Sequence, residues 1–295
     1  MMTRIIRPGV VNILTGGNDL GAMMVKHPNV AHVSFTGSAA TGKHIMASAA
    51  GTLKKLTLEL GGNDPAIVLP GSDISKVAPG VFQRAMYNSG QVCVAIKRLF
   101  VHEDQYDEMV AALAQQAKHS KVGNGLDKGT HFGPINNKMQ YDRVNGLVND
   151  AIKDGGVVVA GGAAAADPKG GYFFQPTIIS NVAEGSRIVD EEQFGPVLPV
   201  LKYRTVEEAI ARSNNTDYGL GSSVWGSDQE QARAVGLKLE AGMTWINDHM
   251  SGGEQFPFGG IKGSGIGVEG GGQLGLKEFV DIKAVKVPKL KPAKN

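Results

Sequence analysis

Short apolar runs that end in glycine alternate along the chain with segments whose apolar residues have helical spacing. In the third run, polar residues separate Leu56, Leu58 and Leu60, which is the period of a strand with one buried face. Strands that alternate with helices are typical of a parallel sheet covered by helices, so an α/β fold is expected. Three early runs are predicted to be strands: residues 11–17, 30–37 and 53–62.

A helix is predicted after the stretch PGSD, residues 70–73. Ser72 or Asp73 can cap its N-terminus, and the helix runs toward Asn88 and delivers Cys93 to the loop beyond its end. Its apolar positions have helical spacing: Val77, Val81, Phe82, Ala85 and Met86. The alternation of helix and strand patterns continues in three later stretches: residues 98–120, 139–162 and 205–248.

No internal repeat or low-complexity linker divides the chain, and a domain seam is expected only near residue 61, where the third predicted strand ends. The final segment, residues 278–289, is also predicted to be a strand, because its apolar residues alternate with polar ones apart from one slip. A strand at a chain end often pairs with another subunit.

Charge and hydropathy exclude several classes of partner. The chain has 295 residues, and 30 basic against 28 acidic residues leave a net charge of +2, too balanced to indicate a nucleic acid or an acidic membrane. No apolar run approaches about 20 residues, and the N-terminal apolar stretch is too short for a signal peptide, so a cytoplasmic protein is expected. The local basic residues near the C-terminus are interpreted as a solvated tail: Lys283, Lys286, Lys289, Lys291 and Lys294.

Cys93 is the only cysteine, which excludes an internal disulfide and a multi-thiolate metal site. The histidines lack ligand spacing, so no metal is expected. A lone cysteine is usually a small buried hydrophobe. Cys93 nevertheless lies among glycine and polar residues, and Glu59 lies at the carboxyl end of a predicted strand, where active-site groups of α/β sheets gather. A thiolate nucleophile and a carboxylate base suit covalent chemistry at a carbonyl carbon.

The stretch FTGSAATGKH nearly matches a nucleoside triphosphate loop. Gly37, Gly42 and Lys43 fit that pattern, but His44 replaces the hydroxyl residue that binds magnesium. Because a predicted strand precedes the stretch and a helix follows it, Ser38 can cap the helix and its free N–H groups favour a phosphate. A dinucleotide pyrophosphate fits better than ATP, and an ordinary glycine-rich turn is the alternative interpretation.

Five motifs follow the order and approximate spacing of the aldehyde dehydrogenase superfamily: FTGS, LELGG, GQVC, EEQFGPVLPV and PFGGIKGSG. The resemblance runs from about Pro8 to Lys286, and together the motifs are highly specific. It implies a partial Rossmann-type cofactor domain, an α/β catalytic domain and a C-terminal segment with an oligomerisation strand. Their expected bounds are residues 1–60, 61–262 and 263–295.

The resemblance implies oxidation of an aldehyde to a carboxylic acid with NAD, or with NADP. In that family the cysteine attacks the aldehyde, a hydride passes to the cofactor, and a water molecule activated by the glutamate releases the acid. By resemblance, Cys93 is the nucleophile and Glu59 the general base. A small-molecule aldehyde is the expected partner, and a homo-oligomer, either a dimer or a tetramer, is the expected assembly.

The same resemblance assigns the binding residues. Phe258 is expected in the substrate tunnel, and Trp245 adds to its apolar character. The implied cofactor residues are Gly37 and Ser38 at the pyrophosphate, Leu60 and Gly61 at the nicotinamide pocket, Glu192 at the ribose hydroxyls and Phe194 beside the nicotinamide.

The sequence also departs from the family pattern, and two alternative hypotheses follow. The N-terminal part of the usual chain is missing, as is the Trp-Asn-x-Pro stretch whose asparagine helps to stabilise the oxyanion; losing one such donor costs on the order of 3 kcal/mol. One alternative is a truncated, catalytically impaired relative that acts as a binding or structural subunit. The other is a CoA-acylating variant, which Glu59 disfavours because a base poised for water favours hydrolysis.

Overall fold

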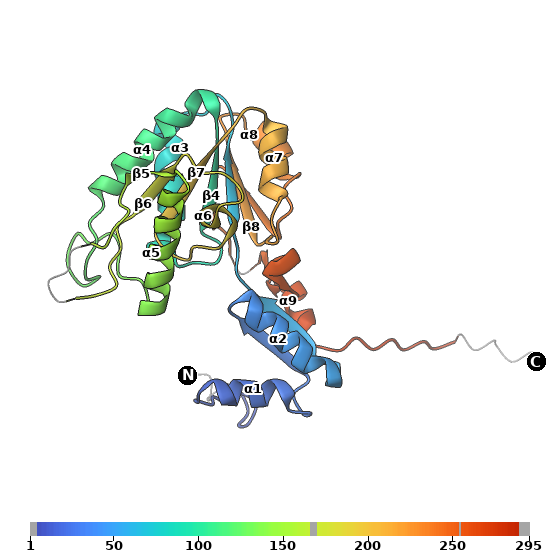
Figure 1. Ribbon diagram of the computed structural model, residues 1–295. Helices are drawn as coiled ribbons and strands as arrows, with labels where there is room; N and C mark the ends of the chain where they lie inside the picture. Colours follow the sequence, from blue (N-terminus) through green and yellow to red (C-terminus); the bar gives the residue numbers. More distant parts are fainter. Residues whose placement is uncertain (1–4, 166–169, 254, 289–295) are drawn as a thin grey trace, which may run out of the picture.

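The computed structural model describes residues 5–165, 170–253 and 255–288 (Figure 1). These residues form a large sheet, a small sheet and a two-stranded pairing of β10 with β12. The large sheet has seven strands in the order β5-β6-β7-β4-β3-β8-β9, and its neighbouring strands run parallel except for β5 against β6. Its strands are β3 (Asp64–Val68), β4 (Ile96–His102), β5 (Val157–Ala160), β6 (Thr177–Ser180), β7 (Val197–Tyr203), β8 (Gly221–Trp225) and β9 (Met243–Ile246).

Helices cover both faces of the large sheet (Figure 1), which confirms the predicted α/β fold. On one face, α3 (Ile74–Met86) and α4 (Tyr106–His119) pack on side chains such as Leu99 and Val101. The apolar positions predicted for α3 are all buried, because they form one stripe along it. The opposite face carries α5 (Lys138–Lys153), α6 (Arg187–Asp190), α7 (Val206–Asn214) and α8 (Gln229–Gly236).

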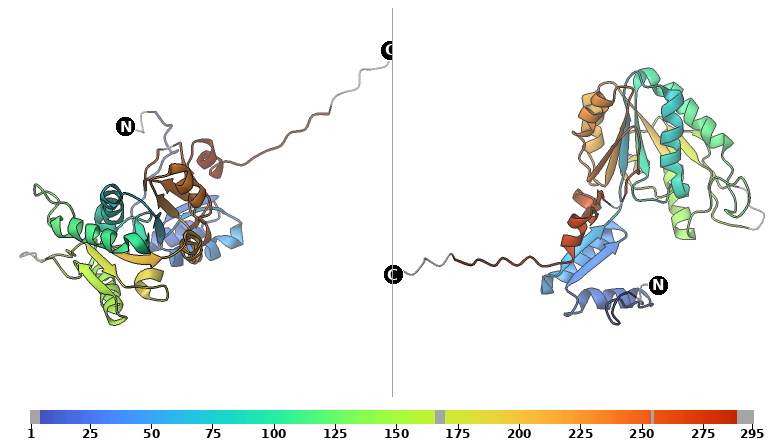
Figure 2. Two further views of the ribbon diagram at one scale, coloured as in Figure 1. Left: turned by 90° about the horizontal axis from the view of Figure 1, so that it is seen from above. Right: turned by 180° about the vertical axis from the view of Figure 1, so that it is seen from behind.

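The small sheet joins the two ends of the sequence. In it, β2 (Lys55–Glu59) pairs in parallel with β1 (His32–Thr36) and antiparallel with β11 (Gly265–Ile266). The sheet and the blue N-terminal helices lie beyond one end of the large body (Figure 2). The remaining elements are α1 (Asn18–Lys26), α2 (Ala39–Ala49), η2 (Ala50–Thr52), η3 (Tyr87–Gly90), η4 (Glu103–Gln105), β10 (Pro257–Phe258), η5 (Lys262–Ser264), β12 (Glu269–Gly270) and α9 (Gln273–Glu278).

The change from one sheet to the other occurs between Glu59 and Asp64, near the predicted seam. β11 lies within residues 263–295, which are predicted to be a separate C-terminal segment. That segment therefore contributes a strand to the small sheet. Within the described ranges, no helix combines the length and the apolar composition needed to cross a membrane.

Two predicted strands are not formed in this chain. Residues 11–17 have no strand pairing, and Ile13 and Leu14 there are 87% and 65% exposed. Of the predicted C-terminal strand, Glu278 ends α9, and residues 279–288 have no sheet neighbour. Phe279 and Asp281 still contact His32 and Lys55 of the small sheet, and the chain beyond them extends away from the body (Figures 1 and 2). A strand needs a neighbouring strand before it becomes part of a sheet, and the described residues provide none at either place. Of the predicted basic tail, Lys289, Lys291 and Lys294 lie outside the described residues.

Candidate active site

Glu59 is the last residue of β2, and its carboxylate is buried. Its backbone carbonyl accepts a hydrogen bond from the N–H of Gly37 at 3.0 Å, which ties it to the turn before α2. Among the described residues, neither carboxylate oxygen has a hydrogen-bond partner. Burial, with a smaller contribution from the charge of Glu269, raises the pKa of Glu59 to about 8. A carboxylate of that basicity can accept a proton from water near neutral pH.

Cys93 is half-buried in the loop between η3 and β4. The chain turns sharply just before it, because Asn88, Ser89 and Gly90 all have positive φ angles. A β-carbon on Gly90, whose φ is +69°, would collide with the carbonyl oxygen of Gly195. Only glycine can adopt that backbone conformation and approach so closely. Gly90 therefore allows the loop that carries Cys93 to pack against the segment before β7.

The pKa of the Cys93 thiol reflects opposing influences. Burial raises it, and the carboxylates of Asp64 and Glu192 raise it further. A hydrogen bond from the backbone N–H of Val94 and the nearby ammonium of Lys97 favour the thiolate instead. Since the thiolate is the nucleophilic form, these two groups promote reactivity against the cost of burial.

Gly61 and Gly62 bring the Glu192 carboxylate and the loop of Cys93 together. The N–H of Gly62 donates a hydrogen bond to Oε1 of Glu192 at 3.1 Å. A β-carbon on Gly61 would collide with Oε2 of Glu192, and one on Gly62 would lie 2.7 Å from the carbonyl oxygen of Cys93. Three predicted site residues, Gly61, Glu192 and Cys93, therefore meet at one place, and Glu59 precedes Gly61 closely in sequence. Gly62, which is not among the predicted site residues, joins them there.

Phe194 and Leu60 lie in different surroundings. The ring of Phe194 is 5.8 Å from Nζ of Lys97, and its backbone has a φ of +48°. The side chain of Leu60 packs in the core of the small sheet with Ile45 and Leu58. The structure thus places Phe194 with the buried groups near the thiol, whereas the Leu60 side chain points into the protein.

Phe258 and Trp245 line a groove of about 810 Å³ beside the thiol loop. Val94, the residue after Cys93, lines the same groove, as does Glu269, whose charge acts on Glu59. Most of the other large side chains in the wall are apolar: Met243, Met250, Phe256 and Pro257. The groove can therefore bring an apolar molecule close to the loop that bears Cys93.

Ser38 is the N-cap of α2, as predicted, and its hydroxyl accepts a hydrogen bond from the N–H of Thr41 at 3.2 Å. A second cavity, of about 650 Å³, lies beside α1, β1 and α2. Gly37 and Ser38 lie in the sequence between Phe35 and Thr41, which line this cavity, but do not line it themselves. Its lining includes Gly21, Val25, Val33, Phe35, Thr41, His44 and Ile45.

Sequence analysis does not identify three buried polar residues near Cys93. Lys97 is 1% exposed on β4, and Asp64 begins β3. His249, fully buried in the loop after β9, donates a hydrogen bond from Nε2 to the carbonyl of Val94 at 2.6 Å, and the same atom lies 3.6 Å from Oδ2 of Asp64. These three residues and the thiol come from separate parts of the sequence, so only the fold brings them together.

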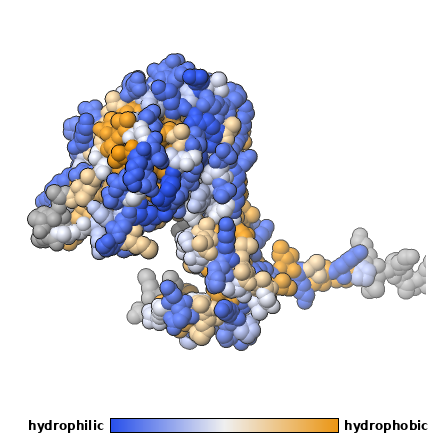
Figure 3. Space-filling view, viewed as in Figure 1, coloured by the Kyte–Doolittle hydropathy of each residue, from blue (hydrophilic) through white to orange (hydrophobic). Residues whose placement is uncertain are grey.

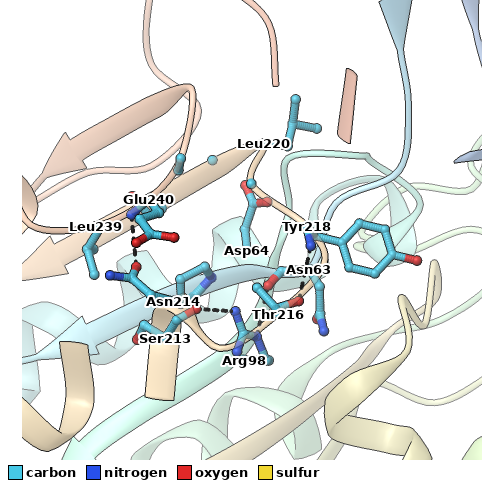
Figure 4. Close-up of a pocket in the computed structure, with 15 residues that line it drawn as sticks. Asn63, Asp64, Arg98, Ser213, Asn214, Thr216, Tyr218, Leu220, Leu239 and Glu240 are labelled. Carbon is cyan, nitrogen blue, oxygen red and sulfur yellow. Dashed lines mark hydrogen bonds between the residues drawn. The ribbon is translucent and has the colours of Figure 1, made fainter. Parts of the chain in front are cut away.

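One signal in the sequence points to part of this cluster. Lys97 and Arg98 interrupt the otherwise apolar run VAIKRLFV, and a cation inside a buried strand needs a partner. Asp64 and Arg98 line one small cavity, in which Arg98 donates hydrogen bonds to backbone carbonyls that include that of Ser213 (Figure 4). His249 lies in a segment without periodicity, and no comparable signal exists for it.

The chain is similar to known proteins over most of its length. The model of the aldehyde dehydrogenase family matches residues 5–285. The chain is 42% identical to aminoaldehyde dehydrogenase 1, peroxisomal, of Pisum sativum, over 94% of this chain and 55% of that protein. It is 41% identical to aldehyde dehydrogenase, cytosolic 1, of Mus musculus, over 94% of this chain and 55% of that protein. The chain thus spans about half the length of the curated relatives it matches.

Solved structures show the same likeness. The NAD⁺ complex of an aldehyde dehydrogenase from Bacillus cereus aligns with a TM-score of 0.88 at 42% identity, over 92% of this chain and 54% of that one. Betaine aldehyde dehydrogenase from Staphylococcus aureus in complex with NAD⁺ aligns with a TM-score of 0.87 at 38% identity, over 90% of this chain and 53% of that one. With its sequence motifs, its fold and these matches in agreement, the chain belongs to the aldehyde dehydrogenase family.

Proposed function

We propose that this chain supplies the nucleophile and the base of an NAD-dependent aldehyde dehydrogenase that oxidises an aldehyde to a carboxylic acid. The observation that carries the proposal is the packing of Gly61 and Gly62 against Glu192 and the loop of Cys93, directly after the buried Glu59. This packing brings together the loop of the thiol and the Glu192 carboxylate, which can accept hydrogen bonds from ribose hydroxyls. Glu59, whose pKa is raised, lies two residues before Gly61.

The chemistry follows from the two reactive side chains. The thiolate of Cys93 adds to the carbonyl carbon of the aldehyde and forms a thiohemiacetal. Bound NAD would supply the acceptor for the two electrons and the hydrogen that leave this carbon, so that a thioester remains on Cys93. Glu59 then takes a proton from a water molecule, whose oxygen attacks the thioester carbon, and the acid leaves as the C–S bond breaks and the thiolate returns.

The fold offers a place for the cofactor. The cavity beside α1, β1 and α2 has an apolar lining that suits an adenine ring, and the capped N-terminus of α2 next to it suits a phosphate. Glu192 has carboxylate oxygens able to accept hydrogen bonds from ribose hydroxyls. We assign Gly37 and Ser38 to the pyrophosphate, Glu192 to the nicotinamide ribose, and Phe194, Gly61 and the backbone of Leu60 to the nicotinamide.

The groove containing Phe258 and Trp245 is the proposed entry for the substrate. Its aromatic and thioether side chains favour an aldehyde with an apolar chain or ring over a charged one. The buried base favours hydrolysis of the thioester over transfer to coenzyme A, because it can activate water.

Two further properties are proposed for the chain. A thiol that must stay reduced favours a reducing compartment such as the cytoplasm. The exposed apolar residues of the C-terminal segment suit pairing with a second copy in a dimer or tetramer, because apolar side chains recur between polar ones along this extended segment (Figure 3). The most exposed of these are Ile282, Val285 and Val287.

Turnover of a panel of aliphatic and aromatic aldehydes, followed as NADH and NADPH formation, tests the proposed function. We expect activity in the wild-type chain and none in Cys93→Ala, because the covalent route needs the sulfur. Activity that persists in the alanine variant would refute the role of Cys93. Folded wild-type protein without turnover on any aldehyde would refute the activity proposed for this chain.

A further inference from the structure

Lys97 is buried next to the loop that carries Cys93 and is hydrogen-bonded to it. Its Nζ donates hydrogen bonds to the carbonyl of Gly90 at 3.1 Å and to that of Val92 at 2.8 Å. These carbonyls belong to the sharply turned segment that delivers Cys93, where three consecutive residues have positive φ angles. The side chain thus bridges β4 to residues on the N-terminal side of Cys93.

The surroundings of Lys97 are buried and ionisable. Burial disfavours the charged form of Lys97 and lowers its pKa. Three groups favour the charged form instead: Glu192 from the segment after α6, Asp64 from β3 and Cys93 itself. The same two carboxylates oppose ionisation of the thiol, and the ammonium favours it. His249, in the loop after β9, contacts the neighbouring Val94 carbonyl. A thiolate formed here would lie among carboxylates, so a nearby cation has a large effect on it.

We propose that Lys97 is a positioning residue for Cys93: its buried ammonium holds the carbonyls of Gly90 and Val92 and places a positive charge next to the thiolate. The inference rests on the proposed role of Cys93 as nucleophile. A long, fully buried cation in a strand is costly to maintain, and the contacts of Lys97 are with the loop that carries the reactive sulfur. Its position therefore joins two effects, the conformation of the loop and the ionisation of the thiol.

A purely structural role makes a different prediction. A neutral amine could also donate two hydrogen bonds, and Val92 keeps another donor, the N–H of Ala95 at 3.1 Å. If Lys97 only braced the loop, its loss would change the access of reagents to Cys93 at every pH by a similar factor. If it stabilises the thiolate, its loss moves the pH at which the thiol ionises.

The test is the rate of Cys93 alkylation by iodoacetamide as a function of pH, followed by mass spectrometry. Because the chain contains one cysteine, each added group reports on that thiol. We expect Lys97→Met to raise the midpoint by at least about one pH unit, which makes alkylation near pH 7 about tenfold slower. Lys97→Arg should bring the midpoint much of the way back to the wild-type value, since it keeps the charge. Lys202→Met, which removes an exposed lysine on the neighbouring β7, should leave the midpoint unchanged.

A reciprocal measurement needs no variant. If the ammonium stabilises the thiolate, the thiolate stabilises the ammonium equally, so capping Cys93 with iodoacetamide should lower the pKa of Lys97 in a lysine-labelled NMR titration. An unchanged midpoint in folded Lys97→Met would overturn the proposal, as would an unchanged lysine titration if that variant does not fold. Neither measurement uses an aldehyde or NAD, so a chain without turnover can still show the shift, which separates this inference from the proposed function.

Discussion

Glu59 is an unusually weak acid because of its position at the end of β2. In water a glutamate is ionised at neutral pH, but here the carboxyl is 3% exposed, has no hydrogen-bond partner among the described residues and lies near another acid. All three features disfavour the charge, and the pKa rises to about 8. The side chain is therefore close to half ionised at mildly alkaline pH, where a general base works well.

We expect Glu59→Gln to separate the two halves of the reaction. The first, single-turnover formation of NADH should persist, whereas release of the thioester should slow by about a hundredfold or more, because glutamine cannot take a proton from water. In the wild type the release step should accelerate with pH through about 8, following ionisation of Glu59. Rapid-quench measurement of the acyl-enzyme checks both, with exposed Glu207→Gln as control. Equal release rates in wild type and Glu59→Gln would contradict the assignment.

The raised pKa also gives Glu59 a signature in stability. The folded chain holds the Glu59 proton more tightly than the unfolded chain, so the contribution of Glu59 to stability is fully present below pH 4.5 and is lost as pH rises toward 8. The loss attributable to this group amounts to up to about 5 kcal/mol. Urea unfolding at pH 5 and pH 9 should show Glu59→Gln gaining on the wild type at the higher pH. A difference that does not grow with pH would mean that Glu59 is not protonated in the folded state.

At the scale of elements, the junction between α3 and β4 determines where the thiol lies. The helix follows its apolar stripe and ends at Met86, and the next residues leave helical geometry through positive φ angles at Asn88, Ser89 and Gly90. Gly90 then packs against the backbone of Gly195. The loop of the thiol is thus held by a neighbouring segment of chain as well as by its own turn.

Gly90→Ala and Gly71→Ala form a matched pair for testing this contact. Both glycines have positive φ angles, +69° and +73°, but a β-carbon at Gly71 meets no atom within 4 Å, whereas at Gly90 it meets the backbone of Gly195. We expect a loss of about 1 kcal/mol for Gly71→Ala and about 3 kcal/mol or more for Gly90→Ala, measured by urea unfolding. The latter should also change the rate of Cys93 alkylation. Similar losses at both positions would show that the contact with Gly195 is unimportant.

At the scale of the whole molecule, the small sheet is built from both ends of the described chain and carries Glu59 at the end of β2. Cys93 lies in the loop that leads into β4 of the large sheet. The cavity against α1 and α2 lies on the small-sheet side, and the groove containing Trp245 and Phe258 lies beside the thiol loop. A cofactor and a substrate would thus approach Gly61 and Gly62 from different parts of the fold.

NAD should stabilise the chain if it binds in the cavity beside α1. At a concentration of 100 times Kd, the gain is about 2.7 kcal/mol, visible as a higher melting temperature. Gly21→Trp, which fills the cavity from α1, should abolish the shift, and Gly21→Ala should keep it, since a β-carbon there meets no atom. A full shift in the tryptophan variant would place the cofactor elsewhere.

Sequence periodicity predicted β1, β2 and α3, but residues 11–17 do not form the predicted strand. Pairing of the C-terminal segment with another subunit stays a prediction. The successful segments have partners within the chain, for example β2 between β1 and β11. Residues 11–17 have no neighbouring strand among the described residues. Periodicity reports which face of a segment can be buried, and pairing depends on what lies next to it.

The sequence by itself determined the α/β class, the family motifs and, through them, Cys93 and Glu59 as candidate reactive groups, because these depend on local order and spacing. The tertiary structure alone decided the raised pKa of Glu59 and the gathering of Asp64, Lys97 and His249 near the thiol. Burial and charge coupling act between atoms that are close in space, and the residues responsible come from strands and loops far apart along the chain.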